Sequence, residues 1–478
     1  MKVNNKALLI AILATVSLAA CGGGGGDAGG GGGNNAPVSE NHPTPASETQ
    51  PDPVTPVAEV PPSNLRYPAS LFTFIAGRQI APVRPLSDGG TVTQYYVTPQ
   101  LPDGLSLDID SGIISGTPTG RQERVTYTVV GKNRGGSTTS GIGITVVPAQ
   151  EWMAASEMYT QRTGPGVAFL TGGQILVAGG MDRGNNQLAT AEVFDPMAQQ
   201  WTTTGTMNTA RGEPAMTALA DGRALVTGGR FLSNFLASSE IYDPKTGRWS
   251  LTGSMKQQRV GPAATLLADG KVLVAGGYAF GSIASSEIFD PSSGKWTDAG
   301  HMTDPREQPT LARLHDGKVL VAGGFSNGAY LSSCELFDPA TGMWSPTAKM
   351  KSARDQYAAI TLHDGRVFVA GGWNSAAVAD AEIYDPSSGT WTSAGKMSVA
   401  RTGASAVQLP SGKVLVSGGS GDSAPQSSAE VYDLATGKWS AVKNMTSGRI
   451  FHKSTILNDG GVMAFGGTTS KTSERWFE

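Results

Sequence analysis

Short apolar segments separated by turn residues run along residues 151–478, and they follow a regular order. In each period an apolar β run ends in a glycine pair, as in residues 272–277 with the sequence VLVAGG. A Glu-x-aromatic segment comes next, and a segment that carries a tryptophan closes the period. Asp-Gly dipeptides such as Asp269-Gly270 stand between the first two β segments, where a tight hairpin needs positive φ angles. The pattern predicts successive units of four short strands.

This unit is repeated along the chain with a period of 47 to 49 residues between tryptophans. A methionine follows each tryptophan by six residues, and an arginine follows the methionine by four. Four-stranded units at this period are typical of the blades of a β-propeller. The glycine pair, the aromatic residue and the tryptophan at this spacing resemble the kelch repeat over residues 151–478. The seven tryptophans are Trp152, Trp201, Trp249, Trp296, Trp344, Trp391 and Trp439.

The two ends of the repeat region predict how the propeller closes. Trp152 opens the region with a fourth-strand segment that has no first three strands before it. The last copy stops after Glu474-Arg475-Trp476, without a fourth strand of its own. We therefore predict an all-β, seven-bladed propeller in which the N-terminal strand around Trp152 completes the last blade and leaves no unpaired edge.

Residues that occur in every copy are expected to serve the scaffold. The tryptophans should pack between blades, where burial of each ring stabilises the fold. The arginines and glutamates recur as matched sets near one face, so each arginine should pair with a glutamate or bind nearby carbonyl groups. As exposed ion pairs they would contribute only about 0–1 kcal/mol each. The arginines are Arg162, Arg211, Arg259, Arg306, Arg354, Arg401 and Arg449, and the glutamates are Glu192, Glu240, Glu287, Glu335, Glu382, Glu430 and Glu474.

A smaller β domain is predicted to precede the propeller at residues 63–148. Short alternating segments are separated there by turn residues. Leu101-Pro102-Asp103-Gly104 and Gly116-Thr117-Pro118 resemble the immunoglobulin-like domain that is common in bacterial surface proteins. The resemblance implies an Ig-like β-sandwich that acts as a spacer or as an adhesive unit, and we favour the spacer.

The first 62 residues are expected to carry an export signal and a tether. Lys2 and Lys6 precede an apolar stretch too short to cross a bilayer, which suits a signal peptide at residues 1–20. Leu18-Ala19-Ala20-Cys21 resembles the lipobox of bacterial lipoproteins, which implies lipidation of Cys21. Residues 21–62 are rich in glycine and proline and poor in apolar residues, so they form a tether.

These features place the protein in the bacterial cell envelope, held to a membrane through its lipid anchor only. Gly22 follows the cysteine, where an aspartate would favour inner-membrane retention, so we favour the outer membrane. The chain has 36 Lys and Arg against 39 Asp and Glu, and this balance excludes a nucleic-acid partner. Two cysteines in 478 residues cannot form a disulfide scaffold.

Candidate ligand-binding residues are those that depart from the repeat. The loops after the glycine pairs share one face of the propeller with the segments that lead into the first strands, and we call this the loop face. Directly after glycine pairs stand Arg230, Tyr278, Phe325 and Trp373, with Tyr330 close by. Trp373 is the one tryptophan that does not stand at a repeated position of the kelch unit. Aromatic rings with an arginine could stack on sugars or hold a peptide, or could pack the loops against one another.

A second group of candidates lies beside the repeated arginines. Glu213, Glu307, Asp355 and His452 begin the inner strands and could rim the central channel. Paired carboxylates there could support acid–base chemistry, although solvated rim residues are the simpler interpretation.

The kelch resemblance includes galactose oxidase, whose copper site needs tyrosines, histidines and a tyrosine–cysteine crosslink. The matching pair here is Phe451-His452, and Cys334 occupies a small packing position, so we expect no copper and no other cofactor. The predicted function is a non-catalytic binding module for a carbohydrate or protein ligand at the loop face. The alternatives are a sugar-modifying enzyme of the mutarotase or epimerase type and a structural adhesin.

Overall fold

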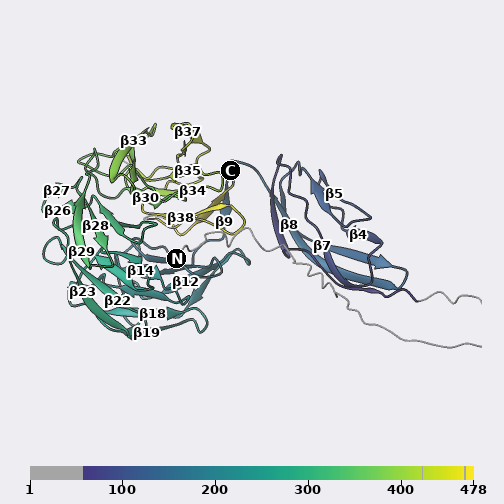
Figure 1. Ribbon diagram of the computed structural model, residues 1–478, viewed down its shortest axis with the longest axis horizontal. Helices are drawn as coiled ribbons and strands as arrows, with labels where there is room; N and C mark the ends of the chain where they lie inside the picture. Colours follow the sequence, from purple (N-terminus) through teal and green to yellow (C-terminus); the bar gives the residue numbers. More distant parts are fainter. Residues whose placement is uncertain (1–57, 422–423, 468–469) are drawn as a thin grey trace, which may run out of the picture. The chain divides into compact units, whose positions relative to one another are not determined.

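The computed structural model describes residues 58–421, 424–467 and 470–478, and their regular structure consists of β-strands (Figure 1). This confirms the predicted all-β class. The described residues contain no helix of the length and apolarity that a membrane span requires. The predicted signal peptide, Cys21 and residues 21–57 of the tether lie outside the described residues.

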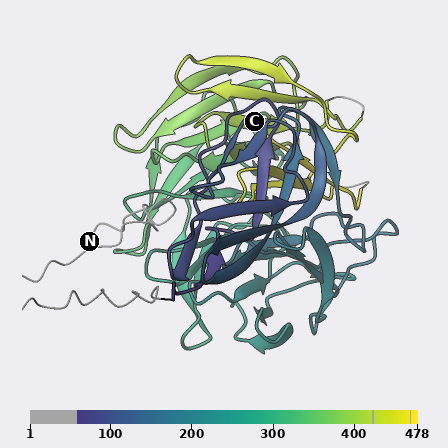
Figure 2. The same ribbon diagram turned by 90° about the vertical axis from the view of Figure 1, so that its right-hand side faces the viewer.

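The Ig-like domain has its own sheets and its own core. Its main sheet has the order β2-β8-β7-β4, in which β2 runs parallel to β8, and two smaller sheets pair β1 with β3 and β5 with β6 (Figure 2, purple to blue). Tyr127, Val129, Ile144 and Val146 alternate with outward residues along β7 and β8 and are buried. The strands are β1 (Pro62–Arg66), β2 (Leu71–Ile75), β3 (Leu86–Gly89), β4 (Gln94–Thr98), β5 (Leu105–Leu107), β6 (Ile114–Gly116), β7 (Gln122–Asn133) and β8 (Gly136–Val147).

The kelch region forms seven four-stranded antiparallel sheets within the described residues, which we number as blades 1 to 7 in chain order. The innermost strands of successive blades contact one another. These first strands are β10 (Gly166–Phe169), β14 (Ala215–Ala218), β20 (Ala263–Leu266), β24 (Thr310–Arg313), β30 (Ala358–Thr361), β34 (Ser405–Gln408) and β38 (Lys453–Ile456). The second strands, all buried, are β11 (Ile175–Ala178), β15 (Ala224–Thr227), β21 (Val272–Ala275), β25 (Val319–Ala322), β31 (Val367–Ala370), β35 (Val414–Ser417) and β39 (Val462–Phe465).

The outer half of each blade carries the Glu-x-aromatic segment and the tryptophan. The third strands are β12 (Ala191–Asp195), β18 (Ser239–Asp243), β22 (Ser285–Asp290), β28 (Cys334–Asp338), β32 (Asp380–Asp385), β36 (Ala429–Asp433) and β40 (Ser473–Trp476). The fourth strands are β13 (Gln200–Thr204), β19 (Arg248–Thr252), β23 (Lys295–His301), β29 (Met343–Thr347), β33 (Thr390–Lys396), β37 (Lys438–Val442) and, for blade 7, β9 (Trp152–Ala155).

Blade 7 is assembled from both ends of the propeller sequence. Strand β9 pairs antiparallel with β40, with Trp152 opposite Trp476, and Figure 1 shows β9 beside the yellow C-terminal strands. The two rings lie 6.3 Å apart and are buried. The outer edge of β40 is therefore covered by the first strand of the region.

The repeated tryptophans connect neighbouring blades. Trp249 of blade 2 packs on Tyr242 at 5.1 Å, and its Nε1 donates to the carbonyl of Gly205 from blade 1 at 2.9 Å. Trp296 makes the same bond to Gly253 at 2.9 Å. These two rings thus pack within one blade and donate a hydrogen bond to the previous blade, as expected of scaffold residues.

The repeated arginines and glutamates pair as expected, but the expectation that the pairs are exposed is wrong. Arg259 and Glu287 are 3.0 Å apart and buried. Arg259 Nη1 also donates to the carbonyl of Gly276 at 2.9 Å, and Glu287 accepts the backbone N–H groups of Lys256 and Gln257. The same ion pair recurs in all seven blades at 2.8 to 3.0 Å. These bonds hold the loop segment that carries the arginine against the third strand, where both charged side chains are buried.

Candidate ligand-binding face

Glycine pairs turn the chain from the second strand of each blade onto the loop face. Gly276 and Gly277 have φ angles of 68° and 98°, and a Cβ on Gly277 would lie 2.8 Å from the carbonyl oxygen of Val260. This close approach requires glycine. It brings the residue after the pair, Tyr278, into a β-bridge with Val260, the residue after the repeated arginine.

Equivalent bridges in blades 2 to 5 pair Arg230, Tyr278, Phe325 and Trp373 with the segments that enter the first strands. Arg230 pairs with Gly212, Phe325 with Glu307, and Trp373 with Asp355. The sequence placed the aromatic residues and the carboxylates in separate groups. The structure brings the two groups together in blades 4 and 5, because each bridge joins one member of each group.

Blades 2 and 3 present a cluster of aromatic rings to solvent. Phe235 meets Tyr278 edge to face at 5.7 Å and Phe280 at 5.2 Å. Phe280 is 83% exposed and Leu232 is 68% exposed. Phe235 belongs to a short hairpin of β16 (Arg230–Phe231) and β17 (Asn234–Phe235), which fixes its position. We call Phe235, Tyr278 and Phe280 the aromatic cluster.

Blade 4 carries a similar hairpin, and blade 5 carries the exceptional tryptophan. Strands β26 (Phe325–Ser326) and β27 (Ala329–Tyr330) hold the rings of Phe325 and Tyr330 5.1 Å apart. Trp373 is half-buried and lies in an isolated bridge, outside the four-stranded sheets that hold the repeated tryptophans.

The carboxylates of blades 4 and 5 differ in burial. Asp355 is only 6% exposed, and among the described residues its Oδ1 has no hydrogen-bond partner. Burial raises the pKa of Asp355 to about 6, and the negative charge of Glu307 adds to this shift. Glu307 is half-buried and accepts a hydrogen bond from Ser282 Oγ at 2.7 Å. The expectation of a solvated rim residue is therefore wrong for Asp355, because its side chain is buried where its segment bridges the loop that carries Trp373.

Glu213 and Arg230 form a separate pair in blade 2. Arg230 Nη2 lies 3.9 Å from Glu213 Oε1 and 3.2 Å from Met181 Sδ. Both charged side chains are partly exposed. The carboxylate of Glu213 thus has a cation of its own beside it.

A cavity of about 370 Å³ marks the mouth of the central channel. Of the four residues predicted to rim the channel, Glu213 and His452 line this cavity, and Glu307 and Asp355 do not. Tyr357 and Lys453, which sequence reasoning missed, also line it. One residue per blade turns there with a positive φ of 46° to 61°, and Gly261 and Gly403 each donate a backbone hydrogen bond to the preceding blade. The seven residues with positive φ share one position in the repeat, two residues after each repeated arginine, and this spacing could have identified them from the sequence. They are Gly164, Glu213, Gly261, Gln308, Gln356, Gly403 and Phe451.

His452 lies in the cavity wall with its ring buried. Its Nε2 is 3.2 Å from Ser417 Oγ. Burial, together with the charges of Arg449, Lys453 and Arg401, lowers the pKa of His452 to about 3. The ring is therefore neutral at physiological pH, and the expectation of a solvated rim histidine is wrong.

The residues present do not fit the copper site of galactose oxidase. Phe451 precedes His452 where a tyrosine would be required. Cys334 is buried in β28, and burial raises the pKa of its thiol to about 11. Across the described ranges, no three or more His, Cys, Asp and Glu side chains gather so as to hold a metal ion.

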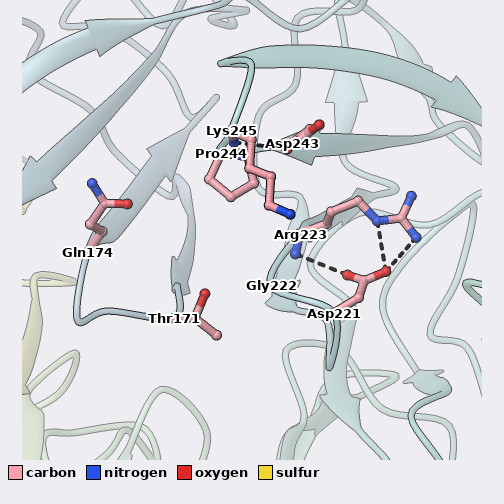
Figure 3. A pocket seen from close by; sticks show the side chains of 8 residues that line it. All are labelled: Thr171, Gln174, Asp221, Gly222, Arg223, Asp243, Pro244 and Lys245. Atoms are coloured by element: carbon pink, nitrogen blue, oxygen red, sulfur yellow. Dashed lines mark hydrogen bonds and ion pairs between the residues drawn. The ribbon is translucent and has the colours of Figure 1, made fainter.

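A second hollow, of about 440 Å³, lies at the opposite ends of the strands, between hairpins of blades 1 and 2. Figure 3 shows that the Asp221 carboxylate there binds Arg223 of the same hairpin, at 2.6 Å. Because this acid is already paired locally, we do not include the hollow in the candidate face. It is lined by Thr171, Gln174, Asp221, Gly222, Arg223, Asp243, Pro244 and Lys245.

Comparisons with known families agree with the repeat pattern. Residues 251–419 match the KLHDC2/KLHL20/DRC7 Kelch-repeats domain, and residues 162–208 and 400–446 match the Kelch motif. Residues 36–147 match the family described as "Putative Ig domain". No curated protein matches the chain at a significant level.

Among solved structures, the chain is similar to a fungal alcohol oxidase of the AA5 family determined in complex with copper. The TM-score is 0.58 at 20% sequence identity, and the match covers 69% of this chain and 76% of the oxidase. At this level of identity the similarity concerns the fold alone. With its kelch repeats, its four-stranded sheets and its separate β domain, the chain is a kelch-repeat propeller protein that also carries an Ig-like domain.

Proposed function

We propose that the propeller is a binding module that takes a polypeptide ligand on its loop face. The observation that carries the proposal is the aromatic cluster, in which large apolar side chains face solvent on loops held by β-bridges and a hairpin. Exposed apolar patches of this kind mark interaction sites, and aromatic anchors dominate the affinity of protein interfaces. Kelch repeats are compatible with this role, since they suggest a protein-interaction or binding module.

A carbohydrate ligand is the second candidate, and Trp373 favours it. A half-buried indole beside the carboxylate of Asp355 combines a stacking surface with a hydrogen-bond acceptor for hydroxyl groups. The edge-to-face packing of Phe235, Tyr278 and Phe280 supports the polypeptide instead, because it gives a bulky apolar surface of the kind that anchors protein interfaces.

Selection of a displayed random-peptide library on the whole chain tests the polypeptide proposal. We expect the natural chain to enrich a set of peptides. The Phe280→Ala variant should bind these peptides at least ten-fold more weakly than the natural chain does. Phe169→Ala is the matched control, since Phe169 is 49% exposed and lies at the far end of β10, away from the loop face. If Phe280→Ala and Phe169→Ala weaken the binding of the enriched peptides equally, the proposal is contradicted. A glycan array probed with Trp373→Ala tests the second candidate.

We further propose that the module is held at the bacterial envelope, in the outer membrane, through a lipid on Cys21. The signal-like segment at residues 1–20 and the lipobox-like Leu18-Ala19-Ala20-Cys21 support this. Cys21→Ser should move the protein from the membrane fraction to the soluble fraction and abolish labelling with a fatty-acid analogue. Unchanged labelling would contradict lipidation at this residue.

A further inference from the structure

We infer that blades 4 and 5 hold a subsite for an organic cation, an ammonium or guanidinium group, between the carboxylates of Glu307 and Asp355 and the rings of Phe325 and Trp373. The inference rests on the proposed function, because the cation would belong to a lysine or arginine side chain of the polypeptide ligand.

Two backbone bridges place each carboxylate next to an aromatic side chain. Glu307 N–H donates to the Phe325 carbonyl at 2.8 Å, and Phe325 N–H donates to the Glu307 carbonyl at 3.2 Å. Asp355 and Trp373 exchange the same two bonds at 3.1 and 2.9 Å. Residues that face each other in this way carry their side chains on the same side of the ribbon, with Cβ atoms about 5 Å apart. Each blade thus offers one acid and one ring together.

The two acids lie close enough to affect each other. The charge of Glu307 helps to raise the pKa of Asp355, although the residues come from neighbouring blades. In the part of the chain that the structure describes, neither carboxylate has a lysine or arginine within ion-pair distance. The subsite is therefore negative and has no cation of its own.

Blade 2 carries an arginine at the position of these aromatic rings. The position occupied by Phe325 in blade 4 and by Trp373 in blade 5 is Arg230 in blade 2. Its guanidinium lies 3.9 Å from the carboxylate of Glu213. The bridge partner of this arginine is Gly212, whereas the corresponding bridge partners in blades 4 and 5 are the acids Glu307 and Asp355. In blades 4 and 5 each acid therefore faces an aromatic residue across the bridge and not an arginine.

Asp355 supplies an independent sign of a missing partner. Its side chain is more than nine-tenths buried, and its Oδ1 accepts no hydrogen bond from the described residues. A buried acceptor without a donor is costly, and a buried negative charge without a counter-charge is more so. A bound ammonium or guanidinium would remove part of this cost, and the flanking rings would add cation–π attraction.

Titration of the full chain with the peptide Ac-Arg-Arg-Arg-NH₂, followed by calorimetry, tests the subsite. We expect Asp355→Asn and Glu307→Gln each to weaken binding at least ten-fold. Glu213→Gln is the matched control, because it removes the same charge from the loop face at a carboxylate that Arg230 already accompanies. It should change the affinity less than two-fold. The neutral peptide Ac-Gln-Gln-Gln-NH₂ should give no heat of binding.

Equal affinity of the natural chain and both acid variants for the arginine peptide would overturn the inference, as would equal binding of the neutral peptide. Spermidine distinguishes a small amine from a peptide side chain. Binding of spermidine alone, dependent on Asp355, would support the cation subsite and overturn its assignment to a polypeptide. If library selection instead enriches neutral peptides that need Phe280 and not Asp355, the inference fails while the proposed function stands.

Discussion

At the scale of single residues, burial disfavours the charged form of two side chains near the loop face. The pKa of Asp355 is raised and that of His452 is lowered, and desolvation is the larger cause in both cases. The two shifts have opposite consequences for the dependence of stability on pH, because one group is an acid and the other is a base.

Asp355→Asn should stabilise the protein at neutral pH. The folded pKa of Asp355 is about 6, above its ordinary value of 3.8, so the folded state binds this proton more tightly than the unfolded state. The contribution of Asp355 to stability is therefore lost as pH rises from about 4 to 6. We expect the variant to raise the free energy of unfolding by about 1–3 kcal/mol at pH 7.5 and by little at pH 4. Urea unfolding at both pH values measures this, and no gain at pH 7.5 would contradict it.

His452 should make the protein sensitive to acid. Its folded pKa of about 3 lies below the ordinary 6.5, so between these values the unfolded state takes up a proton that the folded state does not. The free energy of unfolding should fall by about 1–2 kcal/mol between pH 7.5 and pH 5 on account of this group. His452→Gln should flatten that part of the pH profile, whatever its effect on absolute stability. A profile parallel to that of the natural protein would show that His452 does not cause the loss.

At the scale of strands and loops, the buried Arg–Glu pairs hold each blade to the loop that enters it. Glu287 in β22 binds Arg259 and two backbone N–H groups of the preceding loop, and Arg259 binds the carbonyl of a glycine at the end of β21. One carboxylate thus satisfies several donors that would otherwise be buried without a partner. The pairs fix the loop face from which the candidate residues project.

Glu287→Gln should destabilise the propeller strongly. The substitution leaves the guanidinium of Arg259 buried without its counter-charge, which costs about 3–5 kcal/mol in comparable buried pairs. Glu157→Gln is the control, because Glu157 pairs with Lys471 at 3.0 Å on the surface and should contribute about 1 kcal/mol or less. Chemical unfolding of both variants measures the difference. A loss as small as that of the control would show that the buried pair matters little.

At the scale of the whole molecule, the pairing of β9 with β40 joins the two ends of the propeller sequence in one blade. Without β9, strand β40 would expose a row of unpaired backbone groups, and Trp476 would lose the ring of Trp152. Closure of this kind lets each blade bury both of its faces against neighbours.

A chain that starts at residue 157 should therefore lose stability and aggregate. A chain that starts at residue 149 keeps β9 and is the matched control, with the Ig-like domain removed in both cases. We expect the shorter chain to unfold at least 10 °C lower in calorimetry and to elute as aggregate in size-exclusion chromatography. Equal melting temperatures would show that β9 does not support the ring.

The sequence by itself determined the architecture of the chain. The period of the tryptophans, the glycine pairs and the Asp-Gly turns identified the kelch propeller, because each blade needs the same contacts and repeats the same residues. It also predicted a separate Ig-like domain at residues 63–148, since the alternating segments there lack that period.

Only the tertiary structure determined which groups each loop residue contacts and how far it is buried. Glu213, Glu307 and Asp355 each follow a repeated arginine by one or two residues, yet one lies beside a second arginine, one accepts a bond from Ser282, and one is buried without a donor for Oδ1. The repeated ion pairs were expected to be exposed and are buried. Burial and charge pairing depend on residues brought together across a β-bridge or from a neighbouring blade, and a local pattern contains neither of these contacts.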